Sequence, residues 1–221
     1  VGKRRGVGKF LFESHYRGVW SEVEDGDARS TVVVIGELQS RRFVRQLAQF
    51  VRKVEAVKDL EPGDESQARI SFDDDRFREE CIGARYGAER RDYAAECDRD
   101  LCVSDLACRL RDLGVRVGSD PSGELTVRDP AGRIAAVIEV AAGTAAHLLE
   151  QAVGRLMLRS AKLQREPRRF LAVPGGAGNA CGNELAGLGI RVVPWRWDEG
   201  NAVFDGLAGH LDEMGDRKTR G

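Results

Sequence analysis

Two strand-like runs joined by a short turn constrain the fold of this chain more than any other feature. Residues Glu124-Leu125-Thr126-Val127-Arg128 alternate in the manner of a strand, and the apolar run Arg133–Val140 follows closely. Between them, Asp129-Pro130-Ala131-Gly132 has the composition of a type I turn, with proline second and glycine fourth. The pattern predicts an antiparallel hairpin inside a larger sheet.

The segments around this hairpin alternate between helical and strand periodicity. We expect, in order, a helix at 98–113 with Gly114 as its C-cap, the hairpin at 124–140, a helix at 144–163, a strand at 170–174, a glycine-rich loop at 175–182, a short helix at 184–188, a strand at 189–195 and a last helix at 202–214. The predicted fold class is therefore α/β, with a mixed central sheet flanked by helices.

The chain before residue 98 is less regular, and three regions are predicted overall. Residues 1–30 read as an irregular lead-in, Thr31–Ile35 as a buried strand, Arg41–Leu60 as a basic helix, 61–76 as acidic turns and Phe77–Glu96 as a charged helix. We expect an N-terminal α/β or mainly helical extension at 1–97, which binds nucleic acid or a partner, a core at 98–200, and a C-terminal helix and tail at 201–221.

Composition narrows the class of protein. The 221 residues carry 35 basic and 36 acidic side chains, a net charge of −1, so the chain is no bulk polycation. No apolar run approaches the roughly 18–20 residues of a membrane span, which predicts a protein without a membrane segment. Five cysteines, an odd number, argue against a disulfide framework and predict a reducing, cytoplasmic location.

Glu139, between Ile138 and Val140, occupies a position where the hairpin pattern otherwise predicts an apolar residue. A carboxylate in such a run is costly to bury unless it is paired or bound to a metal ion. Glu124 opens the neighbouring strand, so the two carboxylates together could hold a divalent cation. The residues alone leave a second interpretation open, in which both glutamates face outward.

The same part of the chain resembles the PD-(D/E)XK nuclease superfamily, the restriction-endonuclease-like fold. Members of that family show an acidic residue opening a strand, a hairpin, a Glu-x-Lys strand and then a helix that bears a glutamine. The resemblance covers residues 98–195 and is carried by the order and spacing of five segments: Gly123–Val127, Ala136–Ala141, Glu150–Leu156, Phe170–Pro174 and Leu188–Val193.

The resemblance implies a metal-dependent nuclease that hydrolyses nucleic-acid phosphodiester bonds with Mg²⁺ or Mn²⁺. Glu124 and Glu139 would be catalytic metal ligands, with the Val140 carbonyl as a third ligand and Gln151 as a catalytic residue beside the site. Asp120 is a less well-placed alternative to Glu124, and Asp105 could fill an acidic position that some members have on the preceding helix.

Alanine at position 141 departs from the family pattern, because the family lysine falls there. That lysine is thought to position the attacking water and to stabilise charge in the transition state. Three explanations stay open: Arg155 or Lys162 takes over its role, the domain is an inactive relative kept for binding or assembly, or the lysine was replaced deliberately. The alternative function is thus a non-catalytic nuclease-fold module that binds nucleic acid or a protein partner.

Two clusters of basic residues suit a nucleic-acid partner, with DNA favoured over RNA, although a solvated helix face is an equally ordinary fate for such residues. A protein partner or a homodimer is a further expectation. The predicted nucleic-acid-binding residues are Arg41, Arg42, Arg45, Arg52, Lys53, Arg155, Arg159 and Lys162.

Overall fold

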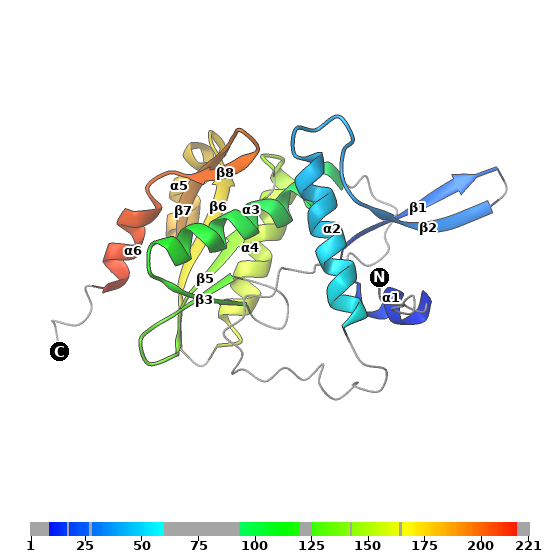
Figure 1. The fold of residues 1–221 in the computed structure, drawn as a ribbon. Coiled ribbons are helices and arrows are strands. Elements are labelled where there is room, and N and C mark those ends of the chain that lie inside the picture. Colours follow the sequence, from blue (N-terminus) through cyan, green and yellow to red (C-terminus); the bar gives the residue numbers. More distant parts are fainter. Residues whose placement is uncertain are drawn as a thin grey trace.

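The structure is a computed structural model, and it describes residues 9–16, 18–26, 28–59, 93–119, 125–141, 143–163 and 165–215. Figure 1 shows a sheet with helices on both sides, and an N-terminal part in which a two-stranded ribbon projects away from that sheet. Within the described ranges, no helix has the length and apolar character that crossing a membrane requires.

The N-terminal part consists of one short helix, a β-ribbon and one long helix. Its elements are α1 (Lys9–His15), β1 (Val19–Asp25), β2 (Ala28–Val34) and α2 (Phe43–Lys58). The basic helix expected at 41–60 is confirmed as α2. The irregular lead-in expected at 1–30 is wrong for α1 and β1, and the strand at 31–35 is not buried, because β1 and β2 pair only with each other.

Six strands form the central sheet in the order β3-β4-β5-β6-β7-β8. Their bounds are β3 (Arg116–Ser119), β4 (Leu125–Arg128), β5 (Ile134–Val140), β6 (Arg168–Pro174), β7 (Ile190–Asp198) and β8 (Asn201–Phe204). The pairs β5–β6 and β6–β7 are parallel, and the other three pairs are antiparallel. The predicted mixed α/β sheet is confirmed.

The hairpin predicted at residues 124–140 is formed by β4 and β5. Its register places Leu125 opposite Ile138 and Val127 opposite Ala136. The Gly132 amide donates to the Asp129 carbonyl at 2.9 Å, which closes the expected turn. The Asp129 side chain accepts hydrogen bonds from two backbone amides of the same turn, which fixes the reversal of the chain.

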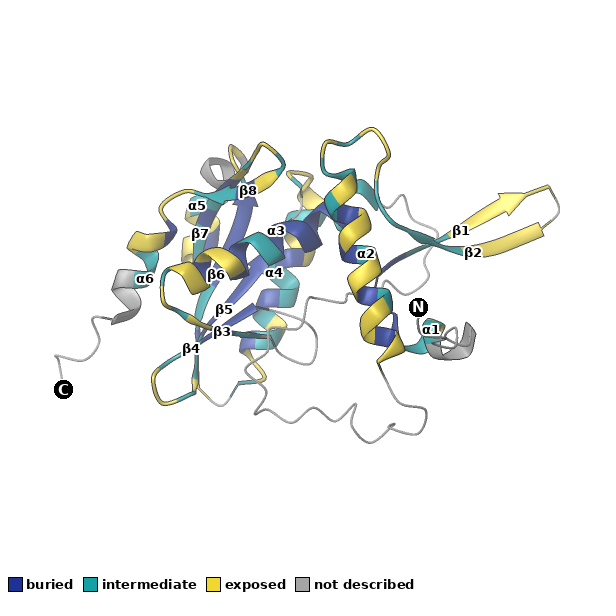
Figure 2. Cartoon of the chain, in the orientation of Figure 1, coloured by how far each residue is buried: buried dark blue, intermediate teal, exposed yellow. Residues whose placement is uncertain are grey.

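Helices cover both faces of the sheet. The remaining elements are α3 (Tyr93–Asp112), α4 (Ala146–Ser160), α5 (Ala177–Gly187) and α6 (Leu207–Gly215). Leu106 and Leu110 of α3 and Leu207 of α6 share one apolar core with Phe170, whereas Leu156 of α4 and Leu185 of α5 share the other with Leu171. Figure 2 shows the sheet as the most buried part of the molecule, between these layers.

In the region of the six-stranded sheet, further elements differ from their predictions. Strand β3 was not expected, because four residues that include Gly118 give no clear alternation. The glycine-rich loop expected at 175–182 is wrong from Ala177 onward, where α5 begins, since packing of that helix on the sheet outweighs weak helix propensity. The helix expected at 202–214 starts only at Leu207, because residues 201–204 pair with β7.

Candidate functional site: a buried carboxylate among arginines

Glu139 lies near the end of β5 with its side chain completely buried. Strand alternation places it on the same face as Val137 and Ala141, which belong to the core beneath α4 and α5. In the parallel pairing with β6 its backbone is opposite Leu171. The outward-facing interpretation is therefore wrong for Glu139, and a buried carboxylate needs compensating partners.

Three arginines supply those partners. Arg99 of α3 donates from Nη2 to Glu139 Oε1 at 2.9 Å, and Arg155 of α4 donates from Nε to the same oxygen at 3.0 Å. Arg159, one turn further along α4, donates from Nη1 to Glu139 Oε2 at 2.6 Å. Both carboxylate oxygens are thus held by guanidinium groups, whose hydrogen bonds to carboxylates are among the strongest in proteins.

Arg99 also binds the carbonyl of Val140. Arg99 Nε donates to Val140 O at 3.1 Å, while its Nη2 binds Glu139. One guanidinium therefore bridges the two atoms of β5 that the family resemblance proposes as metal ligands. Arg99 is itself buried, with a side-chain exposure of 6%, so the bridge lies inside the protein.

Divalent cations such as Mg²⁺ are held by several oxygen ligands, carboxylates above all. Glu139 has guanidinium groups around it instead, and cations in those positions oppose a second cation by charge repulsion. In the described ranges, no three His, Cys, Asp or Glu side chains are grouped to hold a metal ion. The described part of the site therefore does not by itself fit a metal ion. The predicted partners Glu124 and Asp120 lie outside the described residues.

The other residues named by the resemblance have surroundings that differ from those of Glu139. Gln151 is exposed on α4. Ala141 is only 1% exposed and packs in an apolar core. Asp105 of α3 is paired with Arg45 of α2 at 2.5 Å and also accepts the Ala202 amide at 2.7 Å, so it helps to join α2, α3 and β8.

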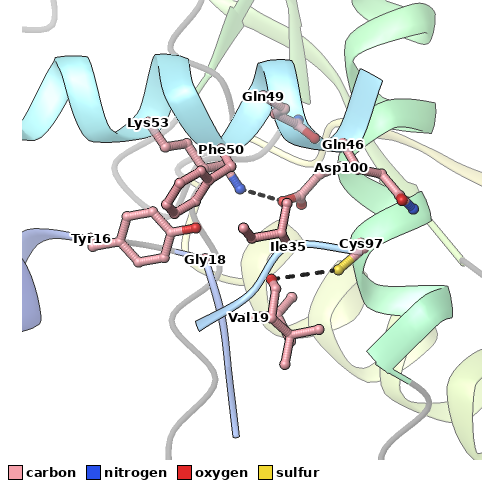
Figure 3. Close-up of a pocket in the computed structure, with 11 residues that line it drawn as sticks. Tyr16, Gly18, Val19, Ile35, Gln46, Gln49, Phe50, Lys53, Cys97 and Asp100 are labelled. Atoms are coloured by element: carbon pink, nitrogen blue, oxygen red, sulfur yellow. Dashed lines mark hydrogen bonds and ion pairs between the residues drawn. The ribbon is translucent and has the colours of Figure 1, made fainter. Parts of the chain in front are cut away.

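Three of the five basic residues predicted at and near the N-terminal helix, Arg42, Arg45 and Lys53, make ion pairs with helix α3. Arg42 binds Asp98 at 2.5 Å, and Lys53 binds Asp100 in a buried pair that Figure 3 shows. With Arg45 and Asp105, these are three pairs in which α2 and its N-cap residue Arg42 provide the bases and α3 provides the acids. The sequence contained this signal only as acids on 98–105 and bases on 42–53, about 50 residues apart.

The remaining basic residues of the prediction reach solvent. Arg41 and Arg52 are exposed beside and on α2, and Lys162 is exposed just after α4. Arg155 keeps a side-chain exposure of 32% although it binds Glu139, and Arg165 is exposed a few residues beyond Lys162. Among the exposed bases of the core, Lys162 and Arg165 lie just beyond the C-terminal end of α4, and others, such as Arg109 and Arg196, lie elsewhere.

A small cavity of about 20 Å³ lies between α2, α3 and the ribbon, with room for a single water molecule. Its lining includes Tyr16, Lys53, Cys97 and Asp100 (Figure 3). Burial, and next the Asp100 carboxylate, raise the pKa of the Cys97 thiol to about 12. The cavity is too small for a substrate, and its thiol stays protonated at neutral pH, so it forms part of the packing between these elements.

In comparisons with known proteins, no protein-family model, curated protein or solved structure matches the chain.

Proposed function

We propose that the region from α3 to β8 is a non-catalytic binding module of nuclease-like fold that holds nucleic-acid phosphates without cleaving them. The observation that carries the proposal is the position of Arg99, which occupies both the Glu139 carboxylate and the Val140 carbonyl. In the described residues, the atoms that would coordinate a cation are thereby used for an internal salt bridge.

The position of the missing lysine supports the same conclusion. Ala141 is buried among apolar side chains, and alanine can neither orient a water molecule nor stabilise developing charge. Arg155 and Arg159 of α4 already bind Glu139. A guanidinium group donates hydrogen bonds and has no acceptor atom, so neither arginine can take a proton from an attacking water molecule.

Phosphate binding is supported by the basic end of α4. Arg155 lies in the last two turns of α4, Lys162 lies in the turn just after the helix, and Arg165 follows three residues later. All three side chains reach solvent. Such a group of bases can contact phosphates of a nucleic-acid strand, in a manner that fixes position rather than reads base sequence.

A metal-dependent nuclease is the second candidate, because the order of elements favours it. A helix, the β4–β5 hairpin, a second helix bearing Gln151 and then a parallel strand follow one another as the family resemblance implies. In that case Glu124, Glu139 and the Val140 carbonyl would hold Mg²⁺ or Mn²⁺, and Arg99 would have to leave both of its acceptors on β5.

Binding of a fluorescent duplex DNA, followed by anisotropy in EDTA over a range of salt concentrations, tests the proposal. We expect metal-independent binding that weakens steeply with salt. Replacing Lys162 and Arg165 with glutamate should weaken binding at least about tenfold and lower the salt slope by about two, one for each lost phosphate contact. The charge-matched control Arg196→Glu, at an exposed position of β7, should leave both quantities close to wild type. Equal losses in both variants, or no binding at all, would refute the proposal.

Cleavage assays separate the two candidates. Wild-type protein with plasmid DNA or RNA in Mn²⁺ should leave both substrates intact under the proposed function. Cleavage that disappears in the Glu139→Gln variant would favour the metal-dependent nuclease instead. The Ala141→Lys variant shows whether the lysine of the family motif alone restores hydrolysis.

A further inference from the structure

Helix α2 carries apolar side chains on the side that does not face α3. Val44 is 75% exposed, Leu47 40% and Val51 45%, and Ala48 is exposed between them. Their spacing of three, one and three residues places all four on one side of the helix. Figure 2 shows a band of exposed positions along α2. A contiguous exposed apolar stripe of this kind is a candidate interaction surface.

The stripe has the same spacing in both directions, with a valine at each end. Read from either end it is valine, a central pair of leucine and alanine, and valine again. If a second α2 lies antiparallel across it, Val44 faces Val51 of the other copy, and Leu47 faces the small Ala48. An interface around a two-fold axis requires this kind of self-complementarity, because the same patch serves both subunits.

The charges at the two ends of the stripe are also complementary in that arrangement. Arg41 lies two residues before the first residue of α2, and Glu55 follows the stripe one turn after Val51; both are exposed. The antiparallel register that matches the valines brings the N-terminal end of each helix, with Arg41, toward Glu55 of the other copy. A parallel arrangement would instead place Arg41 against Arg41 and Glu55 against Glu55, which is repulsive.

We propose that α2 is a homodimerisation surface, in which two copies of this chain pair their α2 helices antiparallel around a two-fold axis near Leu47 and Ala48. The apolar part spans only residues 44–51, about 10 Å of helix, so the interface is smaller than that of an obligate dimer. The dimer is therefore a reversible, concentration-dependent one.

Sedimentation velocity over a wide concentration range tests the surface. For the full chain we expect the weight-average sedimentation coefficient to rise between about 10 and 500 μM. The Val51→Glu variant should stay monomeric throughout, whereas Leu158→Glu, at a 69% exposed leucine of α4, should behave as wild type. Monomeric wild type over the whole range, or unchanged self-association of Val51→Glu, would overturn the proposal. Circular dichroism of each variant confirms that the fold is retained.

A charge exchange tests the antiparallel register. The Glu55→Arg variant places arginine beside Arg41 of the other copy at two symmetric positions, and it should raise the dimer dissociation constant at least about fivefold at low salt. The double variant Arg41→Glu with Glu55→Arg restores opposite charges and should recover wild-type association. A single variant without effect, or a double variant that does not recover, would overturn this pairing. The measurement uses no nucleic acid, so its outcome is independent of the proposed function.

Discussion

Helix α3 makes ion pairs on two sides, and the two sets differ in how many bases share one acid. Toward α2, each of Asp98, Asp100 and Asp105 meets its own base. Toward the sheet and α4, the single carboxylate of Glu139 is shared by three arginines. One-to-one pairs can be removed with local consequences, whereas a shared carboxylate couples all its partners, so the effects of changing it are not additive.

The largest effect is therefore expected at Glu139. The Glu139→Gln variant keeps the shape of the side chain but leaves three guanidinium groups around a neutral amide, in a place where Glu139 itself is fully buried. We expect the free energy of unfolding to fall by about 3–5 kcal/mol, the usual cost of breaking a buried ion pair. Urea denaturation measures it, and a loss below about 1 kcal/mol would show that the carboxylate is not the centre of the cluster.

A smaller effect is expected at the buried pair of the α2–α3 interface. Lys53→Met leaves Asp100 without the base it binds here, and should lower the free energy of unfolding by about 2–3 kcal/mol. Changing Asp100 to leucine as well should recover much of the loss, because a buried ion pair can be replaced by apolar groups at little cost. The matched variant Arg133→Met, at the more exposed pair with Asp129, should change stability by under about 1 kcal/mol. Equal losses at the two sites would contradict the one-to-one description.

The smallest effect concerns pH. In the folded protein the pKa of Cys97 is raised from 9.0 to about 12, first by burial and then by Asp100. Above pH 9 the unfolded chain loses this proton while the folded chain keeps it, so stability is full below pH 9 and falls as pH rises toward 12. Between pH 9 and 10 the loss is about 1 kcal/mol. Thermal denaturation of wild type and Cys97→Ala should show this part of the pH dependence in wild type only, and identical profiles would mean that water reaches the interface.

The elements of the fold that could be predicted from the sequence are those fixed by local sequence preferences. The β4–β5 hairpin and α2 follow from turn chemistry and from periodicity, and both are confirmed. Strand β3 and the start of α5 were missed because four residues and a glycine-rich segment carry little local preference, and packing on the sheet decides their conformation.

The site shows the same limit. The position of Glu139 in an apolar run correctly indicated that a buried carboxylate needs compensation. The sequence could not show which group supplies it, because Arg99 lies 40 residues before Glu139 and meets it only through the packing of α3 near β5. The bases of α2 likewise looked like phosphate ligands, since the acids that bind Arg42 and Lys53 come from a distant part of the chain.

Arginines, and not a cation, occupy the acceptor atoms of Glu139 and Val140. Titration of the metal-free protein with Mn²⁺, with free Mn²⁺ followed by electron paramagnetic resonance, tests this arrangement. Wild type and Glu139→Gln should take up the same small amount of Mn²⁺ at sub-millimolar concentrations. Uptake of one equivalent by wild type, lost in Glu139→Gln while that variant remains folded, would contradict it.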